Sequence, residues 1–220
     1  MSDLMYLLML LIPGICQFYV MHNYKKFSAV YNDADLTGFD VARKILDDNG
    51  LNSVYIVETK GNLSDHYDSN RKTVRLSSDV YRGKSVAAMA VAAHECGHAL
   101  QDKEGYMFLK IRSMIFPFVN ICTKAAYVVL LVGLLFEFLD LVGIGILLVG
   151  TGLLFQLVTL PVEFNASKSA LNILTEYGYD SDIGGAKKML VSAALTYVAG
   201  VLSSLLEVLR LIFIFSNERD

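Results

Sequence analysis

The sequence predicts an α+β fold in which a small α+β domain is combined with about four transmembrane helices. Of the 220 residues, 54% are hydrophobic and only 19% are charged, and the mean hydropathy is +0.46. Soluble domains typically carry about 25% charged residues. Four apolar stretches approach the roughly 20 residues that a helix needs to cross the hydrocarbon core of a bilayer. Polar residues concentrate between the first two stretches, which places a folded domain there.

The four apolar stretches are predicted to be membrane helices. They cover approximately residues 4–20, 121–139 and 142–160, and the fourth lies within 190–215. The first has the length of a secretory signal, but no positive charge precedes it and no clear small-residue cleavage site follows. We therefore interpret it as a retained anchor. Only a short acidic turn with Glu137 and Asp140 separates the second stretch from the third, which predicts a membrane hairpin.

The polar segment between the first two spans is predicted to contain helices and short strands. Thr37 can cap a helix that ends near Asn49. Residues 53–58 alternate between apolar and polar, as in a half-buried strand, and residues 72–76 follow a turn signal as a second strand. Ser85 can cap the next helix.

Charged residues and cysteines indicate the orientation and the compartment. Lysine and arginine are frequent between spans one and two and recur between spans three and four, but the hairpin turn has none. The positive-inside rule then places both polar segments in the cytoplasm and both termini outside. Three scattered cysteines form no disulfide framework and fit a reducing compartment. The net charge of −3 argues against nucleic-acid binding.

The most specific motif is His94-Glu95-Cys96-Gly97-His98, an HExxH pattern. Residues four apart share one face of a helix, so both imidazoles can bind a single metal ion. Glu95 lies next to them, where it can accept a proton from a metal-bound water. The alternative is a pair of unrelated surface histidines. Cys96 is two residues from each histidine and points away from their face, so we interpret it as a packing residue.

A catalytic zinc ion typically takes three protein ligands, so the motif requires a third. Glu163 follows the membrane hairpin, which returns the chain to the side of the histidine helix, and we expect it at the start of a helix there. Its alternative role is that of an acid favoured by the helix dipole. His66 is a second candidate ligand, and His66 or Tyr197 could also stabilise an oxyanion.

Several stretches resemble the YugP-like "putative neutral zinc metallopeptidase" family of multi-pass bacterial membrane proteins. The resemblance covers nearly the whole chain and rests on residues 37–46, 63–68, 74–77, 85–101, 155–164 and 194–198. It implies zinc at His94 and His98, with Glu95 as the catalytic base.

A more distant similarity concerns Glu163. The glutamate that follows a membrane hairpin in heat-shock and CAAX-processing membrane endopeptidases is the third ligand, which implies the same role here. Two positions depart from these patterns: Asn165 stands where the YugP-like pattern leads us to expect an aspartate, and Ser167 stands where the distant group tends to have one. The sequence therefore does not identify the groups that orient His94 and His98.

These observations predict a membrane-bound, gluzincin-type zinc endopeptidase. A zinc-activated water would hydrolyse the peptide bond, with Glu95 as general base, at the cytoplasmic surface of the cell membrane. We expect a peptide or membrane-protein substrate, and the strand at residues 72–76 could offer it an edge. The alternative is a catalytically silent, zinc-stabilised membrane scaffold. The predicted domains are helix 1 (1–21), a zincin-like domain (22–112), the hairpin (113–161), a third-ligand helix and connection (162–189), and helix 4 with the tail (190–220).

Overall fold

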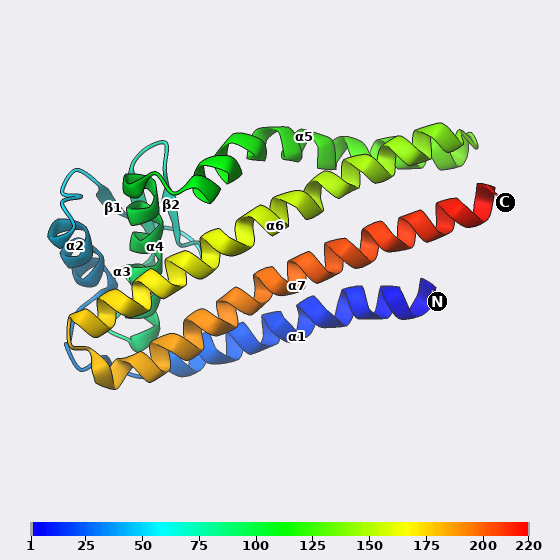
Figure 1. Ribbon diagram of the computed structural model, residues 1–220. Coiled ribbons are helices and arrows are strands. Elements are labelled where there is room, and N and C mark those ends of the chain that lie inside the picture. The colour runs from blue at the N-terminus through cyan, green and yellow to red at the C-terminus, as the bar shows by residue number, and fades with distance from the viewer. Residues whose placement is uncertain (1, 220) are drawn as a thin grey trace. The chain divides into compact units, whose positions relative to one another are not determined.

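The computed structural model describes residues 2–219, which are mostly helical with one small sheet. The elements are α1 (Ser2–Ser28), α2 (Gly38–Asp48), β1 (Tyr55–Thr59), β2 (His66–Asp68), β3 (Thr73–Ser77), α3 (Ser78–Tyr81), α4 (Val86–Glu104), α5 (Met107–Leu135), α6 (Leu139–Glu176) and α7 (Asp180–Arg219) (Figure 1). The chain divides into two compact units. We call Phe18–Tyr106 with Val162–Leu195 the site unit, and Met1–Gln17, Met107–Pro161 and Thr196–Asp220 the apolar unit.

The sheet of the site unit has the strand order β1-β3-β2. β3 pairs in parallel with β1 and antiparallel with β2. The hypothesis that residues 72–76 offer a free edge is therefore wrong, because β3 is the central strand. The chain between β1 and β3 contributes β2 to the far side of β3, so the sheet edges belong to β1 and β2.

Helix α4 forms the centre of the hydrophobic core of the site unit. Its N-terminus is capped by Ser85, whose Oγ accepts a hydrogen bond from the Ala88 N–H, and it ends at Gly105, which has a left-handed φ of 69°. Cys96 is buried, and its thiol donates to the carbonyl oxygen of Ala42 in α2. It is a packing residue, as its position in the motif predicts.

The second part of α6 packs against α4 within the site unit. Val162, Ala166, Ala170 and Leu174 are fully buried and recur every four residues, so they form one face of the helix. A side chain at Gly97 would place its Cβ 2.7 Å from the carbonyl oxygen of Ala166. The glycine of the motif therefore permits a close approach of the two backbones.

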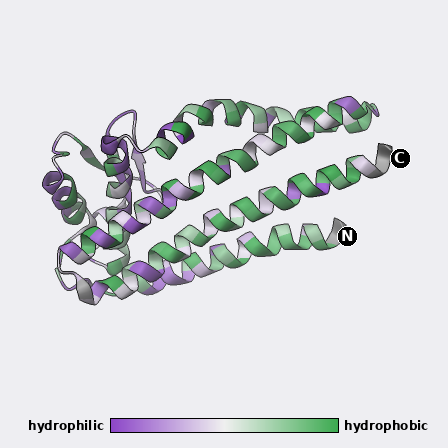
Figure 2. Ribbon diagram, viewed as in Figure 1, coloured by the Kyte–Doolittle hydropathy of each residue, from purple (hydrophilic) through white to green (hydrophobic). Residues whose placement is uncertain are grey.

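The apolar unit contains α5 and the first part of α6, which form a hairpin, together with parts of α1 and α7. Each of these four helices is long and apolar enough to cross a membrane, which confirms the four predicted candidate spans. Large apolar side chains face outward, and Figure 2 shows hydrophobic residues along the helices of this unit. The first residues of α1, the last residues of α7 and the α5–α6 turn lie at the same end of the apolar unit (Figure 1), as the predicted topology requires.

Candidate metal centre

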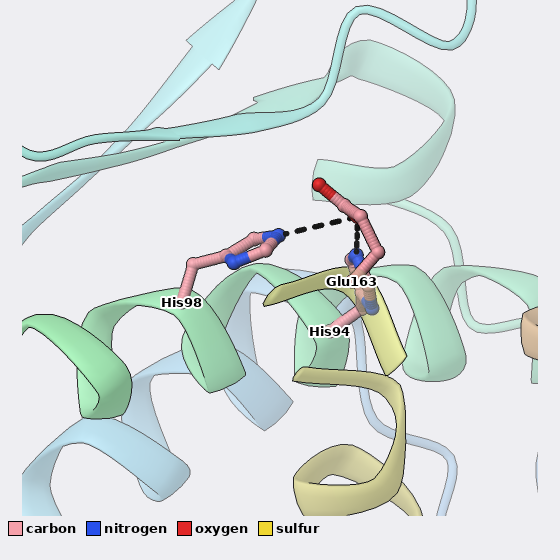
Figure 3. Close-up of side chains that lie close together, drawn as sticks. All are labelled: His94, His98 and Glu163. Atoms are coloured by element: carbon pink, nitrogen blue, oxygen red, sulfur yellow. Dashed lines mark ion pairs between the residues drawn. The ribbon is translucent and has the colours of Figure 1, made fainter. Parts of the chain in front are cut away.

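Two histidines and one glutamate of the site unit converge on one point. The Nε2 atom of His94 lies 3.3 Å from Oε2 of Glu163, and the Nε2 atom of His98 lies 3.7 Å from the same oxygen. Figure 3 shows both imidazoles directed toward the Glu163 carboxylate. These three ligand atoms all lie within 4.8 Å of one another. The helical spacing of four residues brings the histidines together, as the motif predicts.

The donor atoms fit a zinc ion. Two ligands of a tetrahedral zinc site, each bound at about 2.1 Å, lie roughly 3.4 Å apart, close to both distances to Glu163. Two imidazole nitrogens and one carboxylate oxygen are also a ligand set that zinc takes in catalytic sites. Glu163 is only 2% exposed, and a buried carboxylate requires compensation by positive charge or hydrogen bonds. The two imidazoles and a cation would provide it.

Glu163 lies inside the continuous helix α6, 24 residues after the first residue of the helix, Leu139. The expectation that Glu163 begins a helix is therefore wrong, and so is its alternative role as an acid at a helix N-terminus. Pro161 does not end the helix. The buried face that begins at Val162 packs against the core and stabilises the helical conformation beyond the proline.

The second ring nitrogen of each histidine also has a polar neighbour. Nδ1 of His94 lies 3.2 Å from Oγ of Ser167 in α6, and Nδ1 of His98 lies 3.0 Å from Oε1 of Gln101 in α4. Metal-binding histidines usually have such a partner, which fixes the orientation of the ring. Sequence reasoning missed Gln101, although its position three residues after His98 places it on the same helix face.

Glu95 follows His94 directly in α4 and is buried. Burial raises the pKa of its carboxyl, while the imidazoles of His94 and His98 act in the opposite direction. For His98, burial lowers the pKa, but Glu163 and Glu95 together outweigh burial and leave the pKa above its ordinary value. The site therefore combines two acids and two imidazoles in a weakly solvated environment.

The other candidate residues lie outside this group. His66 is exposed in β2, and its Nδ1 is 2.8 Å from the carbonyl oxygen of Ser64. Among the described residues, the metal-type group consists of His94, His98 and Glu163, which favours Glu163 over His66 as the third ligand. Tyr197 belongs to α7 in the apolar unit. Its role as an oxyanion donor, like that of His66, stays a prediction.

Four candidate membrane spans and a group of two histidines and one carboxylate are the features of a membrane metalloprotein. The chain belongs to the family described as "Putative neutral zinc metallopeptidase", whose sequence model matches residues 3–216. It is 48% identical over 206 residues to the "Putative membrane protease YugP" of Bacillus subtilis (strain 168), an alignment that covers 93% of this chain and 92% of that protein. No solved structure matches the chain.

Proposed function

We propose that the protein is a zinc-dependent endopeptidase that hydrolyses peptide bonds at the cytoplasmic membrane surface. The observation that carries this proposal is the convergence of His94, His98 and Glu163, with the acid Glu95 adjacent in the same helix as His94. Membership of a metallopeptidase family supports it.

The residues that would hold zinc are His94, His98 and Glu163, each through one atom. A bound zinc ion supplies Lewis-acid chemistry, because it lowers the pKa of a coordinated water and polarises a carbonyl oxygen. Structural zinc sites are usually closed by four protein ligands, whereas catalytic sites have three and an open position. The three-residue group among residues 2–219 therefore favours a catalytic site.

Glu95 is assigned the proton transfers. As a general base it accepts the proton of the attacking water, and as a general acid it then donates this proton to the leaving amine nitrogen. Burial supports the second role, because it raises the pKa of the Glu95 carboxyl and so favours its protonated form after it has accepted the proton.

The substrate is proposed to be an extended peptide segment or a membrane protein with such a segment. β2 packs against α4, and its side away from β3 has no strand partner within residues 2–219. Backbone pairing with the β2 edge would hold a substrate chain largely independently of its side chains. N-methylation of alternate amides in a peptide substrate should then raise KM.

The cytoplasmic location is proposed from the distribution of charge. Lysine and arginine are concentrated in the segments of the site unit, and the α5–α6 turn of the apolar unit carries Glu137 and Asp140 but no basic residue. The positive-inside rule places the basic segments in the cytoplasm. Cysteine labelling of the α5–α6 turn in intact cells tests this orientation, and labelling only after lysis would contradict it.

The enzyme proposal is tested with the full-length protein in detergent and with the substitution Glu95→Gln. We expect the variant to retain zinc and to lose about 10²- to 10⁴-fold in cleavage of an unfolded casein-type substrate, because the proton acceptor is gone. The control is Glu104→Gln, which changes an exposed acid at the end of the same helix. Equal cleavage by Glu95→Gln and wild type would contradict the proposal.

The third ligand is tested by Glu163→Ala, for which we expect loss of bound zinc. Glu176→Ala is the matched control, since Glu176 is an exposed acid at the end of the same helix. Unchanged zinc content in Glu163→Ala would exclude Glu163 and favour His66. Zinc binding by wild type without any cleavage would favour the alternative, a zinc-stabilised membrane scaffold.

A further inference from the structure

Gln101 connects one proposed metal ligand to the helix that carries another. Its side chain is 2% exposed, and its Oε1 lies 3.0 Å from Nδ1 of His98. Its Nε2 lies 2.8 Å from the carbonyl oxygen of Val162, the residue before Glu163, and 2.8 Å from Oδ1 of Asn165. One buried amide thus contacts the imidazole of His98 and both sides of Glu163 along α6.

The hydrogen-bonding capacities of these groups fix the orientation of the amide. A backbone carbonyl oxygen only accepts hydrogen bonds, so the atom of Gln101 next to Val162 must be the amide nitrogen. The amide oxygen then faces His98, and because this oxygen only accepts, Nδ1 of His98 must carry a proton. In a neutral imidazole one nitrogen is a donor and the other an acceptor. When the imidazole of His98 is neutral, its lone pair therefore lies on Nε2, which faces Glu163.

We propose that Gln101 is a positioning residue that holds His98 in the Nδ1–H tautomer, so that Nε2 is free to bind the metal, and that fixes α4 to α6 at the third ligand. The proposal rests on the proposed function, since it assigns Gln101 a task at the same zinc site.

Asn165 contributes a second hydrogen bond that holds the Gln101 side chain in place. Its Oδ1 accepts from Gln101 Nε2 and so keeps the amide from turning over. An aspartate at this position would also accept, which means that the acceptor oxygen, rather than a negative charge, is what the amide of Gln101 requires. Asparagine in place of the expected aspartate therefore preserves the hydrogen bond that Gln101 donates at this position.

The binding test uses zinc alone with the purified full-length protein in detergent, and compares wild type with Gln101→Met. Methionine has a similar length but neither accepts from His98 nor donates to α6. We expect zinc affinity to fall by about 10- to 100-fold, as is typical when the partner of a ligating histidine is removed. Asn165→Leu should weaken zinc binding by a smaller factor, because the contact with Val162 remains. Asn165→Asp should bind zinc like wild type, and this rescue separates an acceptor requirement from general packing.

A spectroscopic test reads the tautomer directly. The chain has four histidines, so long-range ¹H–¹⁵N spectra of ¹⁵N-histidine-labelled protein can assign each ring. In spectra recorded at a pH high enough for the His98 ring to be neutral, we expect the Nδ1–H form in the wild type and a shift toward the Nε2–H form in Gln101→Met, where Nε2–H can donate to Glu163. If Gln101→Met fails to fold, the same spectra of wild type and Asn165→Leu test whether Gln101 sets the tautomer of His98.

The outcomes separate this proposal from the proposed function. A wild-type His98 in the Nε2–H form, or zinc affinity unchanged in both Gln101→Met and Asn165→Leu, would overturn the positioning role while leaving the peptidase intact. Failure of the wild type to bind zinc would overturn the proposed function itself.

Discussion

The site unit and the apolar unit bury their side chains in opposite ways. The site unit has an extensive core in which residues such as Leu46, Leu76 and Met89 are fully buried. The apolar unit contains a small buried cluster, which comprises Ala126, Leu130, Val142, Ile146 and Val149. Its larger apolar side chains face outward, as Leu147 does with 74% of its surface exposed.

This difference shows which solvent each unit requires. Burial of apolar surface away from water stabilises the site unit as it does a soluble domain. In the apolar unit, outward leucines and phenylalanines would be unfavourable in water but are matched by lipid chains, so helix contacts depend on close packing. Gly133 and Gly145 provide it, because a Cβ at either would lie within 3 Å of Val142 or Leu130 on the facing helix.

The largest expected effect compares two leucines of α6. Leu174 is fully buried in the site unit, and Leu147 is exposed in the apolar unit. We expect Leu174→Ala to lower the free energy of unfolding by about 2–5 kcal/mol, because it leaves a cavity. Leu147→Ala should change it by less than about 0.5 kcal/mol. Chemical unfolding in a mild detergent measures the free energy of unfolding of both variants. Equal losses would contradict the assignment of water as the solvent of the site unit and lipid as that of the apolar unit.

A charge at the outward face of the apolar unit sharpens the same comparison. Leu147→Lys should make the free energy of membrane insertion of the hairpin less favourable by up to about 3 kcal/mol, the typical cost of a lysine at the centre of a membrane helix. Leu147→Ala serves as the size control. A glycosylation-based insertion assay reports the fraction inserted. Insertion of the lysine variant at the wild-type level would mean that this face is not in contact with lipid.

The close approach of α4 and α6 in the site unit gives the next effect. Gly97→Ala places a methyl group 2.7 Å from the carbonyl oxygen of Ala166, and we expect a loss of about 1–3 kcal/mol of stability together with weaker zinc binding. Gly184→Ala in α7 is the control, because nothing lies within 4 Å of its added Cβ. That substitution should stabilise the helix slightly. Thermal unfolding and zinc titration of both variants measure this difference in stability and in zinc affinity.

The smallest effect concerns a helix end in the site unit. Thr37 and Asp40 form a capping box at the start of α2, in which Thr37 Oγ1 accepts from the Asp40 N–H. Thr37→Ala should cost about 1 kcal/mol, because a backbone donor loses its partner. Thr37→Ser keeps the acceptor and should restore most of the stability. Urea unfolding distinguishes them, and equal midpoints for the two variants would show that the cap contributes little.

Local patterns in the sequence predicted much of both units. The lengths and composition of the apolar stretches predicted the four candidate spans, and the spacing of His94 and His98 predicted that their side chains meet. These predictions succeed because helical periodicity and hydropathy act over a few neighbouring residues. The strand order and the continuity of α6 through Pro161 were not predictable in this way, because they depend on which distant segments pack together.

The residues and their spacing define an HExxH helix, a glutamate that follows a hairpin and an apolar composition suited to lipid. How these parts combine follows from the tertiary structure. It brought Glu163 to the two histidines, made β3 the central strand, and placed Gln101 against Val162, which is 61 residues away along the chain. The physical reason is that such contacts are selected by packing and by the need to satisfy buried polar groups, and neither is encoded in the spacing of neighbouring residues.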